Sequence, residues 1–103
     1  MAFTFKKAAR KTGLASVGEI EPAVKIKLNG KEIGYISPVT HRSDSRDRRI
    51  FLAVKQEPTK DDPAPFRWVC LTSRMKDETE ARAFLSEWHS RIVAKYDLYQ
   101  FED

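Results

Sequence analysis

Two histidines and one cysteine are the residues best suited to acid–base, nucleophilic or zinc chemistry in this sequence. His41 and His89 are far apart along the chain, and neither has a cysteine or carboxylate at a spacing typical of zinc ligands. Cys70 lies in an apolar run without a histidine placed to activate it, so we expect a buried structural thiol. A single cysteine forms no internal disulfide, which is typical of a reducing compartment.

Acidic residues and phosphate-binding motifs add no catalytic constellation. Asp44 and Asp47 stand beside arginines in one polar loop, which is a poor setting for a metal or acid site. The sequence has no glycine-rich phosphate loop and no Gly-x-Ser-x-Gly motif. We therefore predict a non-catalytic protein without metal or cofactor.

Basic residues are concentrated in the first part of the chain. Residues 1–60 hold thirteen Lys and Arg against six Asp and Glu, a net charge of +7, whereas residues 61–103 hold six against nine, a net charge of −3. This asymmetry within an overall charge of +4 suggests a basic surface that faces an anionic partner. An excess of solubilising lysines explains the composition equally well.

Two segments carry much of this basic charge. Residues 4–13 place apolar side chains at helical spacing opposite four cations and predict a short basic helix, or arm, that either contacts phosphates or forms a solvated terminus. The loop of residues 37–48 is rich in arginine and aspartate, and either orders on a nucleic-acid backbone or satisfies its own charges. The cations concerned are Lys6, Lys7, Arg10 and Lys11 in the arm, and Arg42, Arg46 and Arg48 in the loop with Arg49 just beyond.

A β-hairpin is the clearest strand signal. Residues 24–28 and 31–36 alternate apolar and polar side chains around Asn29-Gly30, the preferred pair for a two-residue type I′ turn. The pattern predicts that Leu28 pairs with Lys31, Lys27 with Glu32, Ile26 with Ile33 and Val24 with Tyr35. Residues 49–56 and 66–72 predict two more strands. The second of them is largely apolar on both faces, so it should either be central in the sheet or have one face covered by something other than solvent.

The longest segment with one period runs from Asp77 to Tyr96 and predicts an α-helix. Its apolar stripe comprises Ala81, Phe84, Leu85, Trp88, Ile92 and Tyr96. Asp77 is expected to cap its first turn, with Glu80 reaching back as in a capping box. The aromatic side chains of the tail that follows, residues 97–103, are expected to fold back against the core.

These elements predict a single α+β domain of 103 residues. Residues 1–22 form an arm and connector, and residues 23–103 form a four-stranded antiparallel sheet with one long C-terminal helix on one face. The sheet face beneath the helix is expected to comprise Val24, Ile26, Ile33, Tyr35, Ile50, Leu52 and Trp68. No apolar run approaches the roughly 20 residues that span a bilayer, and no secretory signal is evident, so we expect a cytoplasmic protein without a membrane partner.

The opposite sheet face is the main candidate for binding. Cations around an aromatic ring suit nucleic acid, since phosphates meet the cations and a base or sugar meets the ring. The residues expected there are Lys25, Lys27, Arg49, Lys55 and Arg67 around Phe51. The element order is similar to that of double-stranded-RNA-binding domains and of small domains that lay a sheet in a DNA groove, although the acidic residues 77–80 at the helix start would repel phosphate.

The outer face of the long helix supports an alternative. It carries small, nearly neutral residues, which permit close approach of another helix: Ala83, Ser86, Ser90 and Ala94. The sequence therefore predicts a nucleic-acid-binding protein, and the alternative is a protein-interaction module or small regulator that binds another protein or a second copy of itself.

Overall fold

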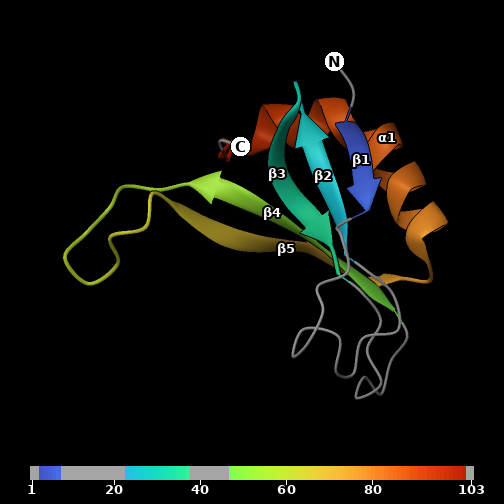
Figure 1. Cartoon of the computed structure of the whole chain (residues 1–103), viewed down its shortest axis with the longest axis horizontal. Helices are drawn as coiled ribbons and strands as arrows, with labels where there is room; N and C mark the ends of the chain where they lie inside the picture. The colour runs from blue at the N-terminus through green and yellow to red at the C-terminus, as the bar shows by residue number, and fades with distance from the viewer. Residues whose placement is uncertain (1–2, 8–22, 38–46, 102–103) are drawn as a thin grey trace.

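The computed structural model describes residues 3–7, 23–37 and 47–101. Its elements are β1 (Phe3–Lys7), β2 (Val24–Leu28), β3 (Lys31–Ile36), β4 (Arg48–Lys55), β5 (Phe66–Met75) and α1 (Glu78–Lys95). The five strands form one antiparallel sheet in the order β1-β2-β3-β4-β5, and α1 lies along one side of it, behind β1 to β3 in Figure 1. The expected α+β class with a C-terminal helix is confirmed. None of the described helices is long and apolar enough to cross a membrane.

The first segment is a strand, so the prediction of a short helix there was wrong for residues 3–7. Phe3 pairs with Leu28 and Phe5 with Ile26, which adds a fifth strand to the sheet. Phe3 and Phe5 alternate with polar residues, so both point to the same face of this edge strand. Phe3 is buried there and is only 5% exposed. The remainder of the predicted helix, residues 8–13, lies outside the described residues. Because the described part of the chain begins with a strand, its element order differs at the start from that of double-stranded-RNA-binding domains, which begin with a helix.

The hairpin turn forms as expected, but its register changes along β3. Asn29 and Gly30 both have positive φ, 55° and 80°, as a type I′ turn requires. The pairs Leu28–Lys31 and Lys27–Glu32 are confirmed, whereas Ile26 pairs with Gly34 and Val24 with Ile36. The predicted pairs Ile26–Ile33 and Val24–Tyr35 were therefore wrong.

A β-bulge between Ile26 and Lys27 explains this register. Ile33 and Ile36 are three residues apart, so a regular strand would point them to opposite faces, yet both are almost fully buried. The extra residue in β3 lets both enter the core and turns Tyr35 to the other face. Gly34 is required at this point because a Cβ atom there would collide with the carbonyl oxygen of Phe51.

The core lies between the sheet and α1. From the helix, Ala81, Leu85 and Ile92 are buried within it. The buried sheet and tail residues of this core are Phe3, Val24, Ile26, Leu28, Ile33, Ile36, Ile50, Leu52 and Leu98. The expectation that Tyr35 and Trp68 lie beneath the helix was wrong, because both contact rings on the opposite face.

Asp77 caps α1 as predicted, whereas the returning hydrogen bond of Glu80 is shifted by one residue. The Asp77 Oδ1 atom accepts a hydrogen bond from the Glu80 N–H at 2.8 Å, which caps the first turn. The Glu80 carboxylate reaches back to the N–H of Lys76 at 2.9 Å, one residue before the cap. The helix therefore starts at Glu78, directly after β5.

The tail after α1 returns to the sheet where β3 and β4 stop pairing with each other. Their shared register covers Gly34–Ile36 and Ile50–Leu52. Beyond it, Leu98 bridges Val54 of β4 and Phe101 bridges Glu32 of β3. Backbone hydrogen bonds of 2.8 to 2.9 Å support both contacts, so the tail links the two strands where they diverge.

Candidate functional site

One row of paired residues crosses all five strands on the face away from α1. Lys6 of β1 pairs with Lys25 of β2, Lys25 with Tyr35, Tyr35 with Phe51, and Phe51 with Cys70 of β5. Residues that pair directly across antiparallel strands point to the same face. The adjoining row contains the buried Val24, Ile36 and Ile50, so this row faces away from the helix. Cations occupy one end and aromatic rings the middle.

Six aromatic rings form a continuous cluster on this face. We define the aromatic cluster as Tyr35, Phe51, Phe66, Trp68, Tyr99 and Phe101. Its ring centroids lie 4.8 to 5.8 Å apart, in alternating stacked and edge-to-face contacts. Such contacts stabilise the rings in fixed orientations. Trp68 lies at the centre of the cluster and is still 46% exposed, so it presents the largest open ring surface of the cluster.

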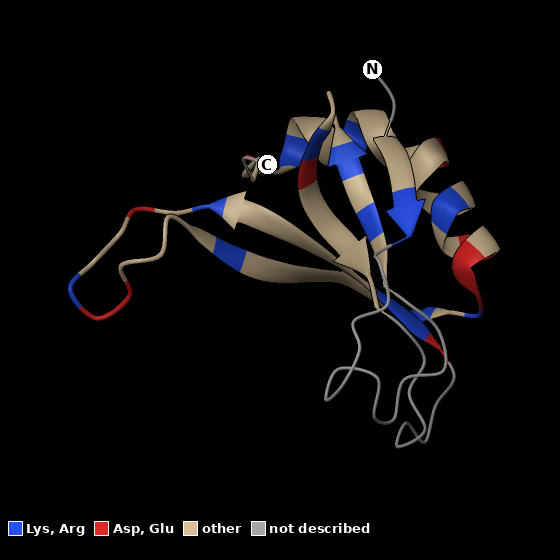
Figure 2. Ribbon diagram, viewed as in Figure 1, with Lys and Arg blue, Asp and Glu red and all other residues tan. Residues whose placement is uncertain are grey.

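The lysines of β1 and β2 lie beside the cluster. Lys6 and Lys25 face each other directly, and in the described part of the chain neither forms an ion pair with an acidic residue. Lys27 lies opposite Glu32, which provides an opposite charge. Figure 2 shows basic segments next to each other on β1 and β2. In contrast, the middle parts of β3, β4 and β5 carry few charged residues.

Cys70 and Tyr35 lie near each other on this face. The expected burial of Cys70 was wrong: the thiol is exposed, and its Sγ donates a weak hydrogen bond to the Thr72 carbonyl at 3.6 Å. Burial of Tyr35 in the cluster raises its pKa above 10.0, because desolvation disfavours the phenolate, and the nearby Cys70 raises it further. The sequence could not reveal this contact because it depends on the bulge in β3.

The Tyr35 phenol should make the protein less stable above pH 10. A raised pKa means that the folded state keeps the proton where the unfolded chain loses it, so stability is present below pH 10.0 and falls as the pH rises through the folded pKa. We expect Tyr35→Phe to flatten this loss in urea unfolding measured across the alkaline range. Tyr96→Phe is the matched control, and an equal effect of both substitutions would contradict the prediction.

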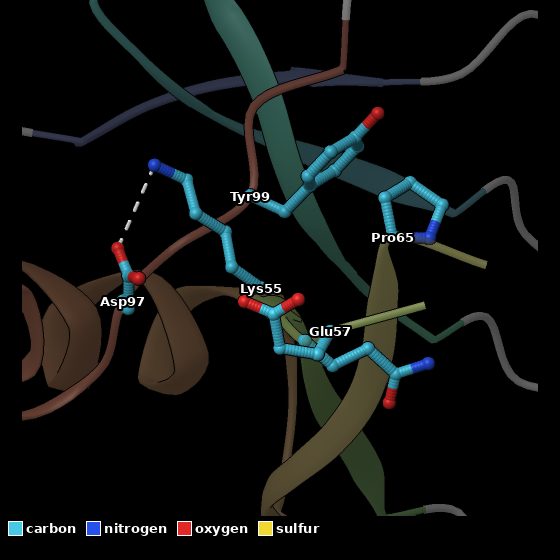
Figure 3. Close-up of a pocket in the computed structure, with 6 residues that line it drawn as sticks. Lys55, Glu57, Pro65, Asp97 and Tyr99 are labelled. Atoms are coloured by element: carbon cyan, nitrogen blue, oxygen red, sulfur yellow. Dashed lines mark ion pairs between the residues drawn. The ribbon is translucent and has the colours of Figure 1, made fainter. Parts of the chain in front are cut away.

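A pocket of about 500 Å³ lies at the tail end of the cluster. Figure 3 shows Lys55 reaching towards Asp97, with Tyr99 and Pro65 on the other side. The Lys55 Nζ lies 3.6 Å from the Asp97 carboxylate, and Glu57 adds a second acidic group to the lining. This end of the face is therefore unfavourable for phosphate, in contrast to the lysine end.

The structure separates several cations that the sequence placed together. Lys7 points to the helix side and lies 3.8 Å from Glu78, and Arg67 pairs with Val54, which places it on the helix side as well. Arg48 donates to the Lys76 carbonyl at 2.9 Å, and Arg49 meets Ser37 through its backbone. Four further predicted residues lie outside the described residues: Arg10, Lys11, Arg42 and Arg46.

The other predicted sites are placed as follows. All four residues of the outer helix face, Ala83, Ser86, Ser90 and Ala94, are exposed. His89 packs edge-on against Phe3 with ring centroids 6.0 Å apart, whereas His41 and Asp44 lie outside the described residues. Within residues 3–7, 23–37 and 47–101, no three His, Cys, Asp or Glu side chains gather in a way that could hold a metal ion.

Sequence reasoning missed five of the six rings in the cluster as site residues. Only Phe51 was placed on this face. The two-sided apolar pattern of β5 was the available signal, since it required a cover for the side that carries Phe66 and Trp68. Tyr99 and Phe101 supply part of that cover from the tail.

Comparison with protein-family models, curated proteins and solved structures finds no significant match to this chain.

Proposed function

We propose that this protein is a non-catalytic nucleic-acid-binding protein that uses the sheet face opposite α1. In this proposal, Lys6, Lys25 and Lys27 contact phosphates, and the aromatic cluster contacts bases or sugars. Cations that follow a backbone beside rings that accept bases are the general features of nucleic-acid binding without sequence preference.

The observation that carries the proposal is the direct pairing of Lys6 with Lys25. Like charges opposite each other on a sheet destabilise the pair, and the described part of this face provides no acidic side chain within ion-pair distance of either ammonium group. A phosphate between the two groups would relieve their repulsion. The pair is therefore better suited to a bound anion than to the free protein.

The aromatic cluster supports nucleic acid over other anions. Tyr35 lies directly opposite Lys25 on the neighbouring strand, so a ligand that contacts both must carry an anionic group and a flat or apolar group close together. Nucleotides combine a phosphate with a planar base. A simple anion would make no use of the exposed Trp68 ring.

The test is binding of single-stranded and duplex oligonucleotides as the salt concentration rises. Affinity should fall steeply between about 50 and 200 mM salt. If three or four phosphates are neutralised, the slope of log affinity against log salt should be roughly −2 to −3 for the single strand and roughly −3 to −4 for the duplex. Fluorescence anisotropy of labelled oligonucleotides measures it. If neither oligonucleotide binds at about 50 mM salt, the proposal is wrong.

A protein partner or a second copy of the chain is the alternative function. Its supporting observation is the exposure of Val93 (39%) and Trp88 (36%) on α1, close to the small outer residues of that helix. The salt titration separates the two functions, because a helix-face contact predicts no salt-dependent binding of oligonucleotides. Arg91 lies 4.7 Å from the Trp88 ring and covers part of it, which reduces the apolar surface available to a partner.

A further inference from the structure

We infer that the nucleic acid bound by this face is single-stranded and that an unpaired base stacks on Trp68. The inference rests on the proposed function and specifies its ligand. It depends on the shape of the aromatic cluster and on the distribution of charge around it.

The shape of the cluster favours unpaired bases. In a duplex the faces of the bases are covered by their neighbours, and an aromatic side chain reaches them only as a wedge between base steps. Trp68 is not placed as a wedge, because Tyr35, Phe66 and Phe101 hold it at centroid distances of 5.3, 5.5 and 5.8 Å. Its open surface is part of a broad ring platform, on which a free base can stack.

The charges around the cluster favour one phosphate backbone rather than two. Lys6, Lys25 and Lys27 lie on the β1–β2 side. On the tail side, Lys55 already pairs with Asp97, and Glu57 lies in the same pocket. A duplex carries phosphates on both sides of each groove, so one of its strands would meet these acidic groups. A single strand can keep its phosphates beside the lysines and turn its bases towards the rings.

The dimensions of the sheet fit a short single strand. In the row where all five strands pair, a spacing of about 4.8 Å places β1 and β5 about 19 Å apart. The Trp68 ring lies beside this row, 5.3 Å from the ring of Tyr35, so the lysines and Trp68 lie within reach of a few nucleotides. A site of on the order of 4 nucleotides lies at the lower end of the range of site sizes for a single-strand-binding OB fold.

The experiment measures binding of a single-stranded oligonucleotide and the duplex of the same sequence to the full chain at about 50 mM salt. The chain has only two tryptophans, so Trp88→Phe leaves Trp68 as the single tryptophan whose fluorescence is followed. We expect the single strand to bind more tightly than the duplex by roughly tenfold or more and to quench Trp68 fluorescence. Trp68→Ala should weaken single-strand binding by roughly 5- to 150-fold, the range found for stacking rings, without changing the salt slope.

Two variants keep this experiment decisive. Trp68→Phe retains a ring and should retain most of the affinity even if Trp68→Ala perturbs folding, whereas Trp88→Ala is the matched control on the helix and should bind as the unmodified protein does. Equal affinity for duplex and single strand, or no quenching of Trp68, would overturn the inference and leave the proposed function intact. Absence of binding to either oligonucleotide would overturn both.

Discussion

The double substitution Lys6→Glu/Lys25→Glu is expected to weaken oligonucleotide binding on the order of 100-fold at about 50 mM salt, while the free energy of unfolding stays nearly unchanged. Loss of two phosphate contacts removes the release of their counterions, and the new carboxylates repel the backbone. Stability is preserved because one like-charge pair across β1 and β2 replaces another.

The single substitution Lys25→Glu separates binding from folding more sharply. It creates an opposite-charge pair with Lys6, so the free energy of unfolding should rise by about 0.2 to 1 kcal/mol. Binding should nevertheless weaken. If Lys25→Glu raises the free energy of unfolding but lowers the affinity for the oligonucleotide, this lysine pair is retained for a ligand. A structural role predicts that both quantities change in the same direction.

Anisotropy titrations and urea unfolding of the same preparations measure these effects. Lys60→Glu is the matched control, because Lys60 is an exposed lysine in the loop between β4 and β5, and this loop lies far from β1 and β2 (Figure 1). It changes the net charge by the same amount as Lys25→Glu. If Lys60→Glu weakens binding as much as Lys25→Glu does, the effect comes from overall charge and the assignment to this face is wrong.

The elements with a strong local signal were predictable from sequence. The Asn29-Gly30 turn requires positive φ at both positions, and the Asp77 cap stands directly before a long apolar period, so nearby residues determine both features. The segment that begins at Phe3 was different. Its five strand residues fit a period of two, but they extend into residues that also fit a helical period, and only pairing with β2 selects the strand.

The candidate site was only partly predictable, because tertiary contacts assemble it. The bulge at Ile26 decides which face Tyr35 joins, and it follows from burial of both Ile33 and Ile36. Lys25 and Phe51 lie on the same face, as the sequence predicted. The bulge shifts the register of β3 by one position, but it leaves Lys25 of β2 pointing away from the core. Arg67 was placed on the wrong face because the phase of β5 relative to β4 cannot be read from a strand that is apolar on both sides.

The tail determines whether the aromatic cluster exists as one surface. Leu98 is buried beneath the sheet at 9% exposure, while Tyr99 and Phe101 contact Phe66 on the other face. Ending the chain after Tyr96 removes these three side chains and the backbone hydrogen bonds to β3 and β4. The free energy of unfolding should fall by roughly 4 kcal/mol or more, since loss of one buried leucine side chain alone costs about 2 to 5 kcal/mol.

Such a loss is a large part of the roughly 5 to 15 kcal/mol that stabilises a domain. A shortened chain that unfolds would lose binding for that reason alone, so point substitutions are needed to connect the tail with binding. Phe101→Ala removes the ring that stacks on Trp68 at 5.8 Å and should lower both the urea midpoint and the affinity for a single strand. Gln100→Ala, between the two tail aromatics, is the control and should change neither. A chain ending at Tyr96 with an unchanged urea midpoint would show that β3 and β4 hold their divergent ends without the tail, and the aromatic cluster would then owe its order to Tyr35, Phe51, Phe66 and Trp68 alone.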